Sequence, residues 1–195
     1  MRFLKLFLTF SLFSFLLAGC FNFDTDTPDD SDTANETERL YETNDYAVII
    51  PKDWEVIEKE NFTSDIPEET DIAFRNNVKN ETFTATATIV ERDLLDTLDS
   101  LEFANRVRNR QKDGLTDYDE ISKEKYNIVV GNTSQETLFI HFAARKTTSD
   151  PLLEYFQTYV TSDDTAYIVG GAVHPNEQEN TSQIVEDIVR SFRLK

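Results

Sequence analysis

The pattern of apolar and polar residues predicts several β-strands between residues 83 and 173. Residues 83–89 alternate apolar side chains with threonines, a period of two that is typical of a strand with one buried face. Residues 166–173 are almost continuously apolar, so we expect that strand to lie centrally with both faces covered. Three further segments are strand-like: residues 126–130, 137–144 and 155–161.

A period near 3.6 residues predicts two helices. Ser100 can cap a helix that runs to about Lys112 and stops at Gly114. The second helix is expected to begin between residues 176 and 181. Its apolar side chains fall on one face, which predicts that this face packs on the core: Ile184, Val185, Ile188, Val189 and Phe192.

Short polar or glycine-containing segments predict how these elements connect. Residues 46–50 are apolar and end at Pro51, and the following turn is expected to return Trp54 to the core. Asp163-Asp164 fits a hairpin turn between the last two strands. Gly170-Gly171, inside an apolar strand, predicts either a bulge or close packing against a helix.

The order of the elements predicts an α+β fold. Strands, a helix, a run of antiparallel strands and a final helix favour a central antiparallel β-sheet sandwiched by helices. We find no internal repeat and no second linker, so residues 41–195 are expected to form a single domain.

The N-terminal residues predict a signal peptide over residues 1–19. Arg2 and Lys5 precede an apolar run over residues 6–17, which is shorter than the roughly 20 residues of a spanning helix. Leu17-Ala18-Gly19-Cys20 resembles the lipobox of bacterial lipoproteins, and Cys20 is the only cysteine of the chain. The resemblance implies cleavage before Cys20 and its modification with lipid, on the extracytoplasmic face of a membrane.

Acidic residues dominate the chain and the segment after Cys20. Removal of residues 1–19 leaves 17 basic and 37 acidic residues, a net charge of −20. Nucleic acid is excluded as a partner, because its binding needs basic side chains against phosphates. Residues 20–40 are acidic and poor in apolar groups, which predicts a disordered tether behind the lipidated cysteine.

The folded part resembles PsbP-like and Mog1-like domains. Residues 46–54 (YAVIIPKDW) are similar to the opening strand, proline and tryptophan of that family, and the segment ending in Ser191-Phe192-Arg193 is similar to its closing helix. The helix at Ser100 also lies where the family has one. The resemblance implies a sheet sandwiched by helices and an accessory binding role, and it carries over no site residue.

Candidate chemistry is sparse. His141 interrupts an apolar strand and His174 precedes Pro175, and we interpret both as structural or solvent-facing. A zinc site would need three or four ligands, and a Gly-x-Ser-x-Gly elbow and a Gly-rich phosphate loop are absent from the sequence. We therefore expect no enzyme activity, no metal site and no cofactor.

Two functions are the leading hypotheses, and a hydrolase with dispersed catalytic residues, which would need a deep pocket that gathers His141 or His174 with a nucleophile, is disfavoured. The first is a lipid-anchored, non-enzymatic accessory module that binds an envelope protein partner. The second is a lipoprotein that binds a small molecule or a divalent cation in an acidic cleft. The sequence does not decide which membrane carries the protein.

Overall fold

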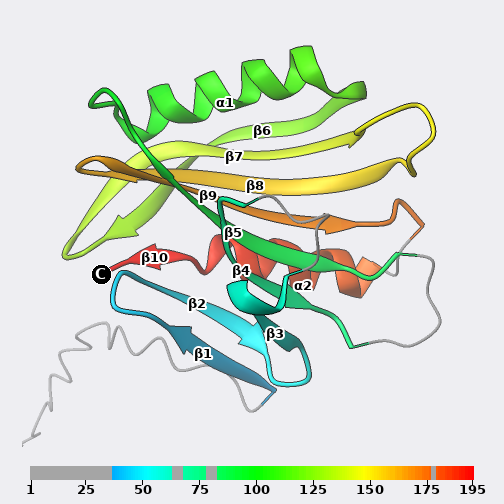
Figure 1. Ribbon diagram of the computed structural model, residues 1–195, viewed down its shortest axis with the longest axis horizontal. Helices are drawn as coiled ribbons and strands as arrows, with labels where there is room; N and C mark the ends of the chain where they lie inside the picture. Colours follow the sequence, from blue (N-terminus) through cyan, green and yellow to red (C-terminus); the bar gives the residue numbers. More distant parts are fainter. Residues whose placement is uncertain (1–36, 63–67, 78–82, 177–178) are drawn as a thin grey trace, which may run out of the picture. The chain divides into compact units, whose positions relative to one another are not determined.

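The computed structural model describes residues 37–62, 68–77, 83–176 and 179–195, all within the compact unit Thr33–Lys195. The described residues form one curled sheet of ten strands in the order β1-β2-β10-β6-β7-β8-β9-β5-β4-β3 (Figure 1). Neighbouring strands run antiparallel except β10 and β6, which are parallel. The strands are β1 (Glu38–Glu42), β2 (Tyr46–Pro51), β3 (Glu55–Glu58), β4 (Thr70–Arg75), β5 (Thr86–Asp93), β6 (Thr116–Val130), β7 (Thr133–Arg145), β8 (Leu153–Ser162), β9 (Thr165–Val173) and β10 (Arg193–Leu194).

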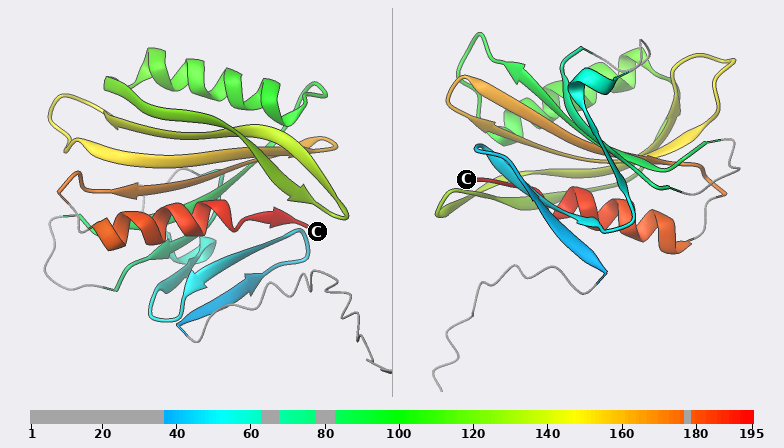
Figure 2. Two further views of the ribbon diagram at one scale, coloured as in Figure 1. Left: turned by 180° about the vertical axis from the view of Figure 1, so that it is seen from behind. Right: turned by 60° about the horizontal axis from the view of Figure 1, so that its bottom comes forward.

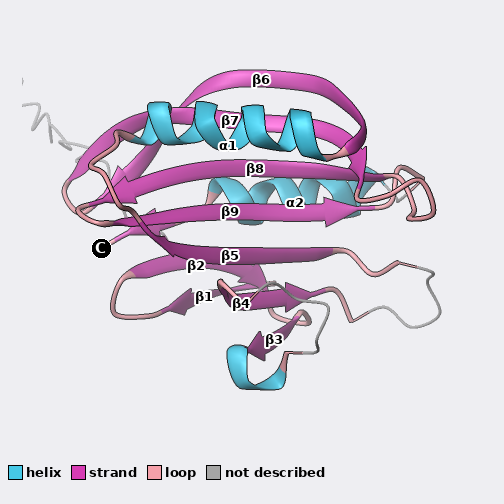
Figure 3. Cartoon of the chain, turned by 45° about the horizontal axis from the view of Figure 1, so that its top comes forward, coloured by secondary structure: helices cyan, strands magenta, loops and turns pink. Residues whose placement is uncertain are grey.

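Helix α1 (Ser100–Gly114) covers one face of the sheet over β7 and β8 (Figure 3). Phe103 and Ala104 are buried against Ile140, Phe142 and Tyr159. Ile140 and Phe142 are two residues apart on β7, so both point to the face of the sheet that α1 covers. The result is a separate hydrophobic cluster between α1 and the sheet.

Helix α2 (Glu179–Arg190) covers the opposite face over β8 and β9, as the view from behind shows (Figure 2). The predicted stripe is confirmed: Val185, Ile188, Val189 and Phe192 are at most 2% exposed, and Ile184 packs against them. Together with α1, this helix completes the predicted α+β sandwich. The short 3-10 helix η1 (Lys59–Asn61) follows β3.

Three local predictions are confirmed in the packing. Trp54 is buried after the turn at Pro51. Asp163 has φ +52° in the hairpin between β8 and β9, and Ser162 pairs with Thr165. At Gly171 the close packing of a helix on the strand is observed, since a Cβ there would lie 2.2 Å from Val185 Cγ1.

Several predicted boundaries differ in the structure. β5 begins at Thr86, three residues after the start of the alternating segment, and extends to Asp93 because it pairs with β9 along its whole length. Asp99, and not Ser100, caps α1: its carboxylate accepts a hydrogen bond from the Glu102 amide at 2.7 Å. The folded region begins before residue 41, because β1 starts at Glu38 and pairs with β2.

The strand predicted at residues 126–130 is the end of a much longer one. β6 spans 15 residues and pairs with β7 along most of its length, with two register shifts. Its first ten residues include six charged side chains, so the sequence pattern gives no strand signal there. None of the helices in the described part of the chain has the length and apolar character needed to cross a membrane.

Candidate functional site

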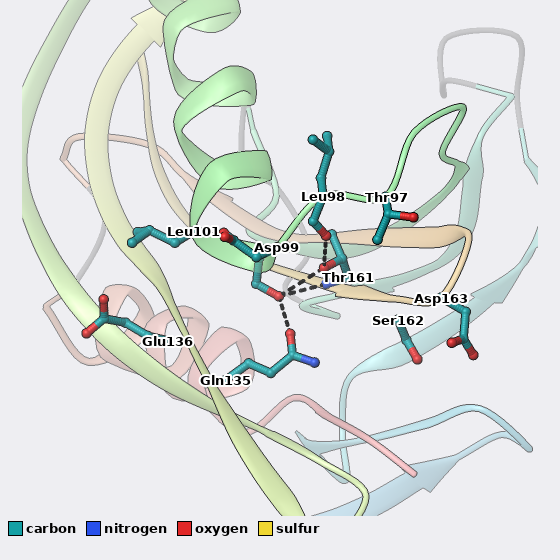
Figure 4. A pocket seen from close by; sticks show the side chains of 10 residues that line it. Thr97, Leu98, Asp99, Leu101, Gln135, Glu136, Thr161, Ser162 and Asp163 are labelled. Atoms are coloured by element: carbon teal, nitrogen blue, oxygen red, sulfur yellow. Dashed lines mark hydrogen bonds between the residues drawn. The ribbon is translucent and has the colours of Figure 1, made fainter.

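A polar cleft of about 660 Å³ opens at the start of α1 (Figure 4). Three segments that are far apart in sequence line it: residues 97–101, which lead into α1, residues 135–136 on β7, and residues 161–163 at the end of β8. The packing of α1 across β7 and β8 brings these segments together. The cleft is therefore a product of the tertiary fold.

Ser100 connects the three segments of the cleft through hydrogen bonds. Its hydroxyl donates to Gln135 Oε1 at 2.5 Å and accepts from the Thr161 amide at 2.9 Å. The Thr161 hydroxyl in turn donates to the Leu98 carbonyl at 2.8 Å. Ser100 is 1% exposed and Thr161 is 5% exposed, so the network is shielded from water.

Carboxylates mark the rim of the cleft. Glu136 and Asp163 lie on opposite sides of it, and Asp99 lies at the helix start (Figure 4). The Asp99 carboxylate already accepts a hydrogen bond as the cap of α1, and Glu136 forms an ion pair with Lys125 at 2.7 Å. A helix N-terminus favours anions, but these negative charges oppose that preference. The cleft is suited to neutral hydroxylated or cationic groups.

The arrangement does not activate Ser100 as a nucleophile. An activated serine delivers its proton to a base such as histidine. Ser100 donates instead to the amide oxygen of Gln135, which has no basic character. The network therefore orders the start of α1 and offers hydrogen bonds to a ligand at its edge.

A second depression of about 480 Å³ is strongly acidic. Glu69, Asp71, Glu91 and Asp93 line it together with Lys59 and Arg92. Asp71 accepts a hydrogen bond from the Tyr46 hydroxyl at 2.5 Å. Partial burial and the neighbouring charges of Asp71, Asp45 and Asp93 raise the pKa of Glu91 above its ordinary value. Across the described residues, however, no three His, Cys, Asp or Glu side chains converge to hold a metal ion.

The two histidines lie apart from both hollows. His141 Nε2 lies 3.0 Å from Glu154 Oε2, and its ring stacks on Phe156 with centroids 4.3 Å apart. His174 Nδ1 accepts a hydrogen bond from the Asn176 amide at 3.2 Å. Each ring thus has a local structural partner. Cys20 and its predicted lipid lie outside the described residues.

The fold is similar to that of several solved structures. The chain aligns with the solution structure of the cyanobacterial PsbP protein CyanoP from Synechocystis sp. PCC 6803, with a TM-score of 0.54 and 11% identity over 84% of this chain and 96% of that one. The chain has a PsbP/Mog1-like fold. Mog1, solved as a mutant protein, aligns with a TM-score of 0.52 and 12% identity, over 80% of this chain and 95% of Mog1.

A third similar structure is LpqN, described as involved in cell envelope biogenesis of Mycobacterium tuberculosis. It aligns with a TM-score of 0.53 and 11% identity, over 81% of this chain and 90% of LpqN. No protein-family model matches the sequence, and neither does any curated protein. At these identities the PsbP/Mog1-like fold is shared, and no site residue transfers with it.

Sequence reasoning found only part of the cleft. It placed Ser100 at the helix start as a cap, whereas the structure makes it the buried centre of the hydrogen-bond network. Gln135 and Thr161 carried no signal, because a polar residue in a strand becomes notable only when its partner across the fold is known.

Proposed function

We propose that this protein is a lipid-anchored, extracytoplasmic binding module that assists an envelope protein complex without catalysing a reaction. One relationship carries the proposal. Cys20 follows the lipobox-like Leu17-Ala18-Gly19, and the first strand begins at Glu38. The 17 residues between them can extend about 55–60 Å, which lets a PsbP/Mog1-like domain reach a partner while it stays attached to the membrane.

The similar structures support this proposal at the level of the fold. LpqN is described as involved in cell envelope biogenesis, and CyanoP is a cyanobacterial PsbP. The acidic composition adds a physical reason for a tethered domain, because a net charge of −20 repels anionic lipid headgroups and holds the domain off the bilayer. Stable attachment then depends on the lipid, and a single acyl chain would give only marginal membrane binding.

The anchor is tested by Cys20→Ala. We expect this variant to move from the membrane pellet to the soluble extracytoplasmic fraction. Asn22→Ala, two residues later, keeps the cysteine and should remain in the pellet. A Cys20→Ala protein that still sediments with membranes contradicts the anchor.

The binding role is tested by crosslinking in native membranes, followed by purification of the lipidated chain and mass spectrometry. We expect a membrane protein in stoichiometric amounts. Val185→Asp places a carboxylate at a fully buried position of α2 and should abolish capture by unfolding the domain. Recovery of no stoichiometric protein at native expression contradicts the accessory role.

The cleft at the start of α1 favours a second candidate, the binding of a small hydroxylated or cationic molecule. A ligand that binds the native state raises the melting temperature. A thermal-shift screen of sugars, amines and divalent cations should then give shifts that Gln135→Ala abolishes and that Gln183→Ala, on α2, leaves intact. No shift with any compound would reject this second function.

A further inference from the structure

A groove of about 380 Å³ runs between α1 and the loop that precedes it. Its floor is apolar: Phe103 is 7% exposed, and Leu98 and Val107 pack against the same cluster. The loop contributes Leu94 and Leu95. We call this feature the α1 groove.

Leu95 is the most exposed large apolar residue in the described chain, at 100%. The adjacent Leu94 is held in place, because its amide donates to the Asp164 carbonyl at 2.6 Å. Single exposed apolar residues are common on surfaces, but this one stands at the mouth of an apolar groove. A partner that enters the groove would cover it.

Three arginines surround the groove: Arg92, Arg106 and Arg110. Arg106 pairs with Glu102 at 2.7 Å in an exposed contact, and Arg92 lies 3.8 Å from Glu69. Arg110 is exposed and has no ion-pair partner among the described residues. Such exposed or absent pairings leave the guanidinium groups available to a stronger carboxylate partner.

The placement of these residues on α1 is regular. Phe103 and Val107 form one row at a spacing of four residues, and Arg106 and Arg110 form the next row. Residues four apart lie on the same side of a helix, about 6 Å apart along its axis. The groove therefore presents an apolar row beside a cationic row, in a chain whose overall charge is −18.

We propose that the α1 groove binds an acidic segment of the protein partner, which seats an apolar side chain against Phe103 and Val107 and its carboxylates against Arg106 and Arg110. This inference rests on the proposed binding function and states which surface performs it. Charge complementarity to Arg106 and Arg110 identifies the segment, because these guanidinium groups attract carboxylates and repel basic partners.

A lipid surface fits the groove less well. A broad anionic lipid surface would meet Asp93 and Asp96 of the loop as well as the arginines of α1, whereas a peptide segment can place its carboxylates along the arginines alone. A concave groove receives a projecting side chain, which a bilayer surface does not present. A protein segment meets both the arginines and the concave apolar floor.

The test places a photo-crosslinking residue at Leu95 in the lipidated full-length chain, in native membranes. A matched position is Ile121 on β6, which is 49% exposed and lies outside the groove. We expect the Leu95 probe to label a partner peptide in which acidic residues outnumber basic ones, and the Ile121 probe to label none. Arg106→Glu with Arg110→Glu should lower the yield by about tenfold or more.

Arg75→Glu is the control for charge reversal, since Arg75 is also half-exposed and ion-paired, to Glu55 on β3. It should leave the yield unchanged. Arg110→Gln, at an exposed position, gives a milder variant that keeps the fold and should still weaken the crosslink. Melting curves of each variant verify folding.

Several results would overturn the α1 groove as the docking surface. They are adducts to lipid, adducts to the acidic residues 21–36 of the chain itself, a basic target peptide, or a yield that the double charge reversal leaves intact. A partner that is captured by the whole protein but labelled only from Ile121 rejects the groove and leaves the binding function standing. If neither the purification of the lipidated chain nor the Leu95 probe captures a partner, both the α1 groove and the proposed binding function are rejected.

Discussion

Gly171 of β9 and Val185 of α2 meet so closely that no side chain fits at the glycine. A Cβ atom there would lie 2.2 Å from Val185 Cγ1 and 3.4 Å from the Thr86 carbonyl oxygen. The helix can therefore pack against the sheet only because position 171 has no side chain. This contact fixes how deeply α2 sits on the strands that form the largest hydrophobic cluster.

Gly171→Ala should destabilise the domain by about 2–3 kcal/mol, because a methyl group must displace either α2 or the strand. Chemical denaturation measures the change. Gly170→Ala is the matched control: a Cβ there meets only the Gln157 side chain at 3.3 Å, which can move. The cost of Val185→Ala should also be smaller in the Gly171→Ala background than in the wild type, and additive costs would refute the steric explanation.

Asp99→Ala should destabilise the domain by about 1 kcal/mol through loss of the cap of α1. For a domain of this size that corresponds to a fall of about 2–4 °C in melting temperature. Asp99→Asn keeps an oxygen that can accept from the Glu102 amide and should remain close to wild type. Equal losses in both variants would show that charge, and not capping, is responsible.

Glu120 is expected to stabilise the fold in a pH-dependent way. Hydrogen bonds from Arg108, one of them 2.9 Å from Nη2 to Oε1, lower the pKa of Glu120 below its ordinary value. The stabilisation is therefore complete above the unfolded-state pKa of about 4.3 and is lost as the pH falls through the folded pKa. Glu120→Gln should cost about 1 kcal/mol at pH 7 and nothing near pH 2.

The exposed pair of Arg106 and Glu102 provides the comparison for that experiment. Both side chains are more than half exposed, so Glu102→Gln should change stability by less than about 0.5 kcal/mol at any pH. Equilibrium unfolding of both variants between pH 2 and pH 7 makes the measurement. A pH-independent cost of Glu120→Gln would rule out the ionic contribution.

Glu91→Gln should stabilise the domain at neutral pH, in contrast to Glu120→Gln. Partial burial and the charges of Asp71, Asp45 and Asp93 raise the pKa of Glu91, so its ionisation opposes folding above that pKa. The substitution should stabilise the domain at pH 7, and the gain should disappear below about pH 4. The expected gain is only about 0.5 kcal/mol, because Glu91 is largely exposed and solvent screens its charge. Asp119→Asn on β6 controls for the general loss of one negative charge.

The elements whose signal is local could be predicted from the sequence. The apolar stripe of α2, the alternation within β5 and the turn at Asp163 depend on one segment each, and each is observed close to its predicted place. The α+β class follows from their order. The resemblance of residues 46–54 and of the closing helix to PsbP-like and Mog1-like domains also agrees with the observed fold.

The remaining features depend on contacts between segments that are distant in the sequence. The first half of β6 is too polar to predict as a strand and is held by its pairing with β7 and by the contact of Glu120 with Arg108 of α1. The two-residue β10 exists only between β2 and β6. The polar cleft and the α1 groove likewise join residues from distant segments. Local periodicity indicates which face of an element is buried. Strand partners and surface hollows depend on contacts between distant segments, and no single segment of the sequence encodes these contacts.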